Sequence, residues 1–486
     1  MPYRGRVTPH HPESVVIVLF GATGDLASRM VMPAMFELRA RGLMPDHWRL
    51  IGSAGDDLGE DGFAALLRGS LERSGDLPPD FDDVAAHLRY VGGFFSADEP
   101  GELPAVLGEV REELRAAGGS DPLVVFFLAV PPAAFPAITE GLGRHGLADG
   151  ARVVFEKPYG TSSQSFEELD ALVKRTLEED QVFRIDHFLG KEGVQAIYTL
   201  RFANKLFGAQ WDRHSVAQVQ IDVPETLNVD TRASFYEATG AALDMLVTHL
   251  FQVVSQVAMD TPYDLADPES VLFERDAVLH RFRPLDVEND VVLGQFEGYR
   301  DLDGVAADSD QDTFVAARLW VDSDRWRGVP FVLRTGKMMA RKAQLVTLVL
   351  RPDEGPLSAV AARPNTIEVN FSGAGGISLG VTVKAPGPDA HLSYGHAVLD
   401  LDDVPGGEPL SPYASLIDDV LRGDRSLFTT ELGLRAAFRA FEPLLGQGRP
   451  TPIPYEPGGW GPEEARRLVE PFGWMLEQLE RVPGED

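Results

Sequence analysis

The sequence has no cysteine, and that absence excludes several kinds of chemistry. Among its 486 residues there can be no disulfide bond, no thiolate nucleophile and no cysteine-bound metal. The early part of the chain also lacks a long apolar run, since its longest one, residues 15–20, is far shorter than the ~20 residues that a membrane-spanning helix needs. No basic stretch precedes this run and no cleavage-site pattern follows it, so we expect no signal peptide and a cytoplasmic protein.

Positive charge is scarce as well. The chain carries 44 lysine and arginine residues against 75 aspartate and glutamate residues, a formal net charge of −31. This balance argues against nucleic acid and anionic membranes as partners, and an anionic ligand would need a local group of basic residues. Only seven residues are lysine, and four of them fall in the candidate sites described below: Lys157, Lys191, Lys337 and Lys342.

The length predicts two domains, and the first begins with a nucleotide-binding pattern. Residues 14–20 are a continuous apolar run, typical of a buried parallel strand, and residues 21–27, GATGDLA, follow at once. A helical pattern then continues to about Arg41, so strand, glycine turn and helix resemble the opening of a Rossmann domain. A plain strand-to-helix turn is the alternative. The candidate cofactor-binding residues of the turn are Gly21, Thr23, Gly24, Asp25 and Leu26.

The second predicted strand, residues 48–51, bears on which cofactor is bound. Its exit loop contains Gly55, Asp56 and Asp57, at the place where this fold meets the adenine ribose. A carboxylate there accepts from a ribose 2′-hydroxyl and repels a 2′-phosphate, so the loop favours NAD over NADP. The alternative is an exposed acidic loop without a ligand.

Further strands are predicted over residues 123–130 and 152–155, alternating with helical patterns. Such alternation indicates a parallel, doubly wound sheet that binds its ligands at the carboxyl ends of the strands. Lys157 follows the strand 152–155 directly, where a side chain is placed for recognition rather than for the core.

Residues 184–192, RIDHFLGKE, form a third candidate site. If Asp186 caps a helix, His187 and Lys191 are four residues apart on one face and form a cationic fork suited to a phosphate. A helix start that is merely charged is the alternative.

The segments 156–160, EKPYG, and 184–192, after the early GATGDLA, resemble the glucose-6-phosphate dehydrogenase family. Segments 223–226, 244–249 and 328–337 follow in the family's order. The resemblance implies an α/β Rossmann domain over residues 1–185. It implies a larger α+β domain over residues 186–486, with a wide, mostly antiparallel sheet for substrate binding and dimerisation.

The patterns of the second half agree with that implied fold. Strands are predicted over residues 216–223, 345–351, 366–371 and 377–383, and one long helix over 241–259. Helical patterns return over residues 414–422 and 431–441.

The family reaction oxidises the C1 hydroxyl of glucose 6-phosphate to a lactone, the first step of the pentose phosphate pathway, with hydride transfer to NAD or NADP. His249 matches the family's base and Asp186 the carboxylate that orients it; no metal is expected. Without the resemblance, a core histidine would be the simpler interpretation of His249. The implied substrate-binding residues are His187 and Lys191 for the phosphate, Glu225 and Asp244 for sugar hydroxyls, Lys337 and Lys342, and Lys157, which also meets the cofactor. The resemblance also implies a homodimer or homotetramer.

Several positions depart from the family pattern. Met30 stands where lysine is usual and is expected to join Leu26 and Ala34 on a core-facing stripe. Phe188 replaces a frequent tyrosine, and Leu243 replaces a usual arginine. Glycines that are usual near Ser234 and Ala238 are also replaced. Gly55 stands where the family has the arginine that binds the 2′-phosphate. These losses leave open a different sugar substrate or a catalytically weak, regulatory paralogue.

Overall fold

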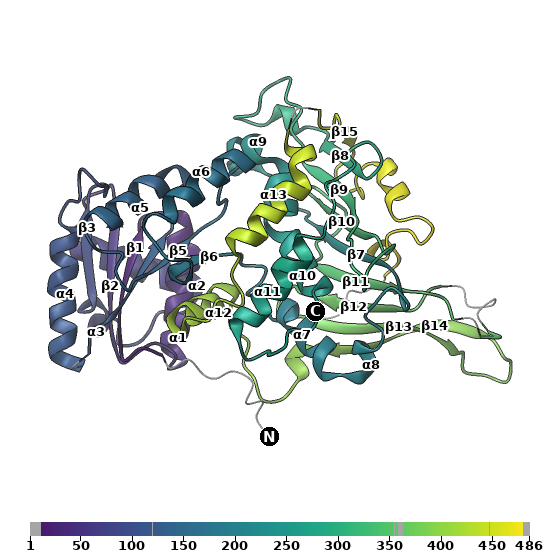
Figure 1. Ribbon diagram of the computed structural model, residues 1–486, viewed down its shortest axis with the longest axis horizontal. Coiled ribbons are helices and arrows are strands. Elements are labelled where there is room, and N and C mark those ends of the chain that lie inside the picture. Colours follow the sequence, from purple (N-terminus) through teal and green to yellow (C-terminus); the bar gives the residue numbers. More distant parts are fainter. Residues whose placement is uncertain (1–10, 119, 354, 358–362, 447, 480–486) are drawn as a thin grey trace. The chain divides into compact units, whose positions relative to one another are not determined.

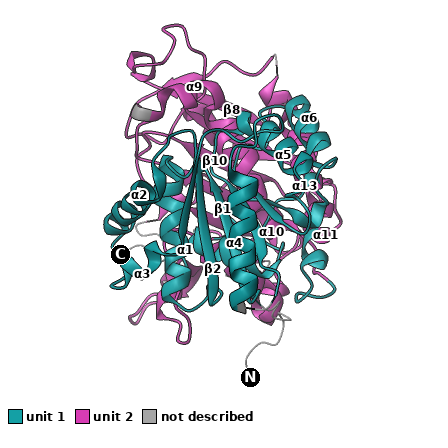
Figure 2. Ribbon diagram, turned by 90° about the vertical axis from the view of Figure 1, so that its left-hand side faces the viewer, with its two compact units in different colours: residues 1–190, 263–272, 410–431 teal, residues 191–262, 273–409, 432–486 magenta. Residues whose placement is uncertain are grey.

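The computed structural model describes residues 11–479 apart from 119, 354, 358–362 and 447, and they form two compact units (Figure 2). Unit 1 contains the chain up to Gly190 together with residues 263–272 and 410–431. Unit 2 contains residues 191–262, 273–409 and the chain from Leu432 onwards. The chain therefore leaves unit 1 and returns to it twice, while the predicted division between residues 185 and 186 stays a prediction.

Unit 1 is built on a six-stranded parallel sheet in the order β3-β2-β1-β4-β5-β6 (Figure 1). This is the strand order of a Rossmann dinucleotide-binding domain, so the predicted class is confirmed. All residues of β1 are buried, as the unbroken apolar run predicts for a strand covered on both faces. The strands are β1 Ser14–Phe20, β2 His47–Ala54, β3 Leu88–Gly92, β4 Leu123–Leu128, β5 Arg152–Phe155 and β6 Val182–Arg184.

One helix of unit 1 comes from far along the chain. α12 (Pro412–Arg422) packs on α1 (Met32–Ala40), and its Ile417 and Val420 share an apolar cluster with the strand residue Ile17. The Arg152 guanidinium donates to two carbonyls in the last turn of α12, those of Val420 and Leu421. The other helical segments are η1 Ala27–Val31, α2 Gly59–Ser74, α3 Phe81–Ala85, α4 Leu103–Gly118, η2 Pro132–Ala134, α5 Phe135–Arg144, α6 Ser163–Val173 and η3 Glu179–Gln181.

Unit 2 contains a nine-stranded sheet in the order β14-β13-β12-β11-β7-β10-β9-β8-β15. Among the described strands of this sheet, only β7 with β10 and β8 with β15 pair in parallel, so the predicted wide, mostly antiparallel sheet is confirmed. The strands are β7 Val216–Pro224, β8 Val291–Phe296, β9 Phe314–Leu319, β10 Phe331–Gly336, β11 Leu345–Leu350, β12 Thr366–Asn370, β13 Gly376–Lys384, β14 Leu392–Asp400 and β15 Ile453–Tyr455.

Figure 1 shows α7, α10 and α13 alongside one face of this sheet. The helical segments are α7 Glu192–Ala203, α8 Lys205–Gly208, η4 Asp230–Arg232, α9 Ala233–Ala241, η5 Ala242–Leu250, α10 Phe251–Ala258, η6 Tyr299–Asp301, η8 Leu401–Asp403, α13 Glu431–Leu445, η9 Glu463–Leu468 and η10 Leu476–Gln478. The helix α11 (Pro268–Leu279) is divided, since its residues 268–272 belong to unit 1 and the rest to unit 2.

The helix predicted over residues 241–259 is more complex than one regular helix. The backbone breaks at Gly240, with φ +63°, and continues as η5, a π-helix, before α10. The stretch 233–258 is long and apolar enough to cross a membrane, but 94% of its most apolar window is buried inside the protein. It is a core element.

The helix start predicted at Asp186 is wrong. The Asp186 carboxylate accepts the backbone N–H of Phe188 at 2.9 Å, which closes a tight turn instead of opening a helix. The helix α7 begins only at Glu192, with Lys191 as its N-cap. His187 and Lys191 therefore do not share a helix face.

Candidate active site

The glycine turn after β1 forms a backbone cradle. Gly21 has φ +74°, and a Cβ there would lie 2.3 Å from the carbonyl oxygen of Ala129, so only glycine fits. The N–H groups of Gly21 and Ala22 donate to the Ser53 carbonyl, which ties the turn to the end of β2. The helix that follows starts at Asp25, so the turn leads directly into a helix N-terminus, which favours negative charge.

The acidic loop after β2 lies beside that turn. The Thr23 hydroxyl donates to the Asp56 carboxylate at 3.2 Å, and the Tyr90 hydroxyl donates to the Asp56 carbonyl at 2.6 Å. These two contacts fix the exposed Asp56 next to the phosphate cradle. The structure thus brings Gly55 and Asp56 next to the glycine turn.

A buried carboxyl lies at the carboxyl end of β5. Burial raises the pKa of Glu156 to about 7, although a hydrogen bond with Tyr413 and the charge of Lys157 oppose the shift. Lys157 itself is half-buried at the same strand end. Tyr413 belongs to α12, so this long-range helix supplies a polar group to the strand end.

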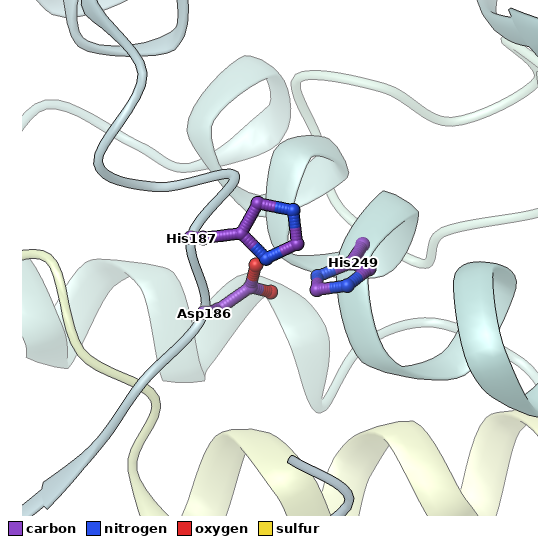
Figure 3. A group of neighbouring side chains, drawn as sticks. All are labelled: Asp186, His187 and His249. Atoms are coloured by element: carbon purple, nitrogen blue, oxygen red, sulfur yellow. The ribbon is translucent and has the colours of Figure 1, made fainter. Parts of the chain in front are cut away.

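The end of β6 is held by a buried arginine. The Arg184 guanidinium donates to Glu179 at 2.7 Å and to Asp170 at 3.2 Å, and its carbonyl accepts from Thr429 N–H. This anchoring holds the start of the segment that follows β6, on which Figure 3 labels Asp186 and His187. Asp186 is buried.

His187 packs between two aromatic rings. Its imidazole lies nearly parallel to the Tyr413 ring, with centroids 6.3 Å apart and 14° between the planes, and edge-on to Phe188. Tyr413 therefore contacts both Glu156 and His187, a role that no local sequence signal indicated.

In unit 2, the two predicted substrate-binding residues Glu225 and Lys337 form an ion pair. The Lys337 ammonium also lies 5.5 Å from the centroid of the Tyr236 ring. The next residue, Met338, has φ +51°, the only positive value at a non-glycine residue in the described part of the chain.

The other predicted lysines of unit 2 have different surroundings. The Lys191 ammonium donates to the Gln344 side chain at 2.7 Å, on the segment that leads into β11. Lys342 is exposed.

The helix η5 carries Asp244 and His249, both buried (Figure 3 shows His249 on this helix). They are five residues apart on this π-helix. The start of η5 is capped by Asp312, whose carboxylate accepts the Ala242 N–H at 2.8 Å. Arg449 pairs with Asp312 at 2.9 Å.

The departures from the family pattern are also located. The expectation that Met30 faces the core is wrong, because its side chain is 42% exposed. Phe188 and Leu243 are buried. Sequence reasoning missed Tyr413, Gln344, Tyr236 and Asp312, which reach their partners only through the tertiary fold.

Comparisons with known proteins match both parts of the chain. Residues 18–196 match the family model described as the NAD binding domain of glucose-6-phosphate dehydrogenase, and residues 198–475 match its C-terminal domain. A curated relative, glucose-6-phosphate 1-dehydrogenase 2 of Mycobacterium tuberculosis, is 35% identical over 489 residues, covering 94% of this chain and 93% of the relative. A second, glucose-6-phosphate 1-dehydrogenase of Aggregatibacter actinomycetemcomitans, is 32% identical, covering 95% and 97%.

Solved structures agree with the sequence relatives. The crystal structure of glucose-6-phosphate 1-dehydrogenase from Mycobacterium avium is 33% identical, covers 96% of this chain and 98% of its own, and has a TM-score of 0.82. A glucose-6-phosphate dehydrogenase in complex with its substrate glucose 6-phosphate is 28% identical, with the same coverage and a TM-score of 0.87. The chain therefore belongs to the glucose-6-phosphate dehydrogenase family.

Proposed function

We propose that this protein oxidises the C1 hydroxyl of glucose 6-phosphate to 6-phosphogluconolactone, with hydride transfer to a nicotinamide cofactor. The observation that carries the proposal is the family match over 94% of the chain to proteins named as glucose-6-phosphate 1-dehydrogenases. In this role the protein catalyses the first step of the pentose phosphate pathway.

In the proposed mechanism His249 accepts the proton of the C1 hydroxyl. A neutral imidazole suits this task near neutral pH, and such a base contributes ~10²–10⁴-fold in rate. Asp186 orients the imidazole and stabilises it once it is protonated. Both side chains are buried, which supports the assignment. The attraction between a carboxylate and an imidazolium is stronger inside a protein than in water, because the effective dielectric constant is lower.

The remaining predicted residues bind the substrate. His187 and Lys191 are assigned to the phosphate and need no common helix for that role. Glu225 accepts from a sugar hydroxyl, and its ion pair with Lys337 supports a shared place in the site. Asp244, Lys342 and Lys157 complete the proposed set.

The glycine turn fits the pyrophosphate of a dinucleotide, because Gly21 leaves its cradle open where a Cβ would collide with Ala129. The bound cofactor supplies the hydride acceptor. Gly21, Thr23, Gly24, Asp25 and Leu26 would hold its phosphates, and Asp56 beside Gly55 would accept from a ribose 2′-hydroxyl. We therefore propose a preference for NAD over NADP.

A second candidate is a dehydrogenase of another sugar, or a catalytically weak regulatory paralogue. The exposed Met30 and the buried Phe188 and Leu243 favour it, because none of them can donate the hydrogen bonds of the usual residues. Each lost charge-assisted hydrogen bond would cost roughly 1.5–3 kcal/mol.

One assay separates these candidates: the formation of reduced cofactor from glucose 6-phosphate and from glucose, each with NAD and with NADP. We expect turnover with glucose 6-phosphate and the higher kcat/KM with NAD. No turnover in any combination would contradict both enzyme proposals, and a strong NADP preference would contradict the assignment of Gly55 and Asp56.

We also propose that the protein is cytoplasmic and forms a homodimer or homotetramer. The edge strand β14 supports self-association, since its Val398 and Leu399 are exposed.

A further inference from the structure

Phe94 is the most exposed large apolar side chain among the described residues, at 84%. It lies two residues beyond the end of β3, at the carboxyl edge of the parallel sheet and next to the loop that follows β2. Single exposed apolar residues are common on protein surfaces and usually need no explanation. The surroundings of this one do point to a ligand.

The Phe94 ring rests on Gly55. A Cβ built on Gly55 would lie 2.8 Å from Cζ of the ring and 3.1 Å from Cε1. The ring can therefore take this position only because residue 55 has no side chain. One side of the ring is supported by the Gly55 backbone, and most of its surface remains open to solvent.

The same loop carries the polar groups of a nucleoside site. Asp56 follows Gly55 directly, and Thr23 of the glycine turn donates to its carboxylate at 3.2 Å. Gly92 lies close to Asp57, with a built Cβ 3.2 Å from Asp57 Oδ1. The phosphate cradle, the acid for the ribose and an open aromatic ring therefore succeed one another along one edge of the sheet, in the order of the groups of an adenosine phosphate.

We propose that Phe94 is the platform on which the adenine of the cofactor stacks, and that Gly55 and Phe94 act as a pair that determines cofactor specificity. Aromatic rings stack on any nucleobase, so Phe94 contributes affinity, while Asp56 selects the ribose. The ring also fills the space that a side chain at residue 55 would need, including an arginine for a 2′-phosphate. The inference rests on the proposed function only in taking the ligand to be a nicotinamide dinucleotide.

The test is calorimetric titration of the full-length protein with AMP and, separately, with nicotinamide mononucleotide. Phe94→Ala is expected to weaken AMP binding on the order of 10-fold and to leave the mononucleotide unchanged, because only AMP contains adenine. Phe94→Tyr keeps an aromatic face and should stay within about 2-fold of the wild type. Phe273→Ala, at a phenylalanine that is 66% exposed on α11, is the matched control and should change neither affinity.

Two results would overturn the proposal: AMP affinity within about 2-fold of wild type in Phe94→Ala, or an equal loss in Phe94→Tyr. Thermal unfolding of each variant shows whether a loss comes from misfolding. Failure of this proposal can be distinguished from failure of the proposed NAD preference. Phe94→Ala should lower the affinities for AMP and for adenosine 2′,5′-bisphosphate by the same factor, whichever of the two ligands the wild type prefers.

The pairing with Gly55 has its own test. Gly55→Arg alone should displace the ring and weaken AMP binding. The double variant, Gly55→Arg with Phe94→Ala, should bind adenosine 2′,5′-bisphosphate more tightly than Gly55→Arg alone does. A gain of bisphosphate affinity in Gly55→Arg with undiminished AMP affinity would show that the two residues do not compete for the same space.

Discussion

At the scale of single residues, the buried Glu156 is the clearest case of a side chain whose charge depends on its surroundings. Burial raises its pKa from 4.5 to about 7, and Tyr413 opposes the shift. The folded protein therefore holds a proton on Glu156 between about pH 4.5 and 7, where the unfolded chain has released it. The contribution of Glu156 to the free energy of unfolding therefore falls as the pH rises through that window.

Glu156→Gln removes this titration. The variant should gain stability relative to the wild type as the pH rises from 5 to 8, with a change on the order of 2–3 kcal/mol between the two values. Urea unfolding at both pH values measures it. An identical difference between variant and wild type at pH 5 and pH 8 would show that Glu156 does not titrate in this range.

His249 is the residue on which the proposed chemistry depends most. His249→Asn should lower kcat by about 10²-fold or more and leave cofactor binding intact, because the amide cannot accept the hydroxyl proton. Steady-state kinetics with a parallel cofactor titration measures both. His280→Asn is the control, since His280 is exposed and its imidazole bonds to the backbone carbonyl of Asp276. Near-normal turnover of His249→Asn would remove it from the base role.

At the scale of elements, the π-helix η5 depends on the break that precedes it. Gly240 has a positive φ, and a Cβ there would lie 2.6 Å from Oδ1 of Asp312, the residue that caps η5. Two constraints, backbone strain and a collision with the cap, therefore require glycine at this position.

The strained backbone alone usually costs about 1–3 kcal/mol, and Gly240→Ala should lower the free energy of unfolding by more than that, because the collision adds to the strain. The variant should also have a lower kcat, because Asp244 and His249 shift with η5. Thermal unfolding and kinetics report the two effects. Gly298→Ala is the matched control: its φ is +93°, but a Cβ there meets nothing within 4 Å. If both variants lose the same stability and keep the same kcat, the collision with Asp312 has no consequence.

Elements differ in how well the sequence predicts them. The strands 14–20 and 152–155 are observed with the predicted bounds, because apolar runs between polar or glycine residues suffice to define buried parallel strands. The prediction of a helix start at Asp186 was wrong. An aspartate can accept a nearby backbone N–H either at the start of a helix or in a turn, and the sequence does not distinguish the two; here it accepts from Phe188 in a turn. The π-helix η5 carries no sequence signature that separates it from an α-helix.

At the scale of the whole molecule, self-association through the nine-stranded sheet can be tested at its edge. Val398→Lys on β14 places a charge among the exposed apolar side chains of that strand, which should weaken strand-edge pairing and shift the protein toward the monomer. Sedimentation velocity measures the shift. Leu357→Lys, at an exposed leucine outside the strands, is the control. An unchanged oligomer in Val398→Lys would place the interface elsewhere.

The sequence by itself determined the family, the two classes of sheet and the candidate residues of the active site, because these follow from local patterns and short motifs. Only the tertiary structure revealed that α12 returns from residue 412 to bring Tyr413 to Glu156 and His187. It likewise revealed that Asp312 caps η5 and that Phe94 lies over Gly55. Each of these contacts joins residues that are far apart in the chain. Such residues come into contact because helices and strands pack together and exclude water, and a local sequence pattern does not predict that packing.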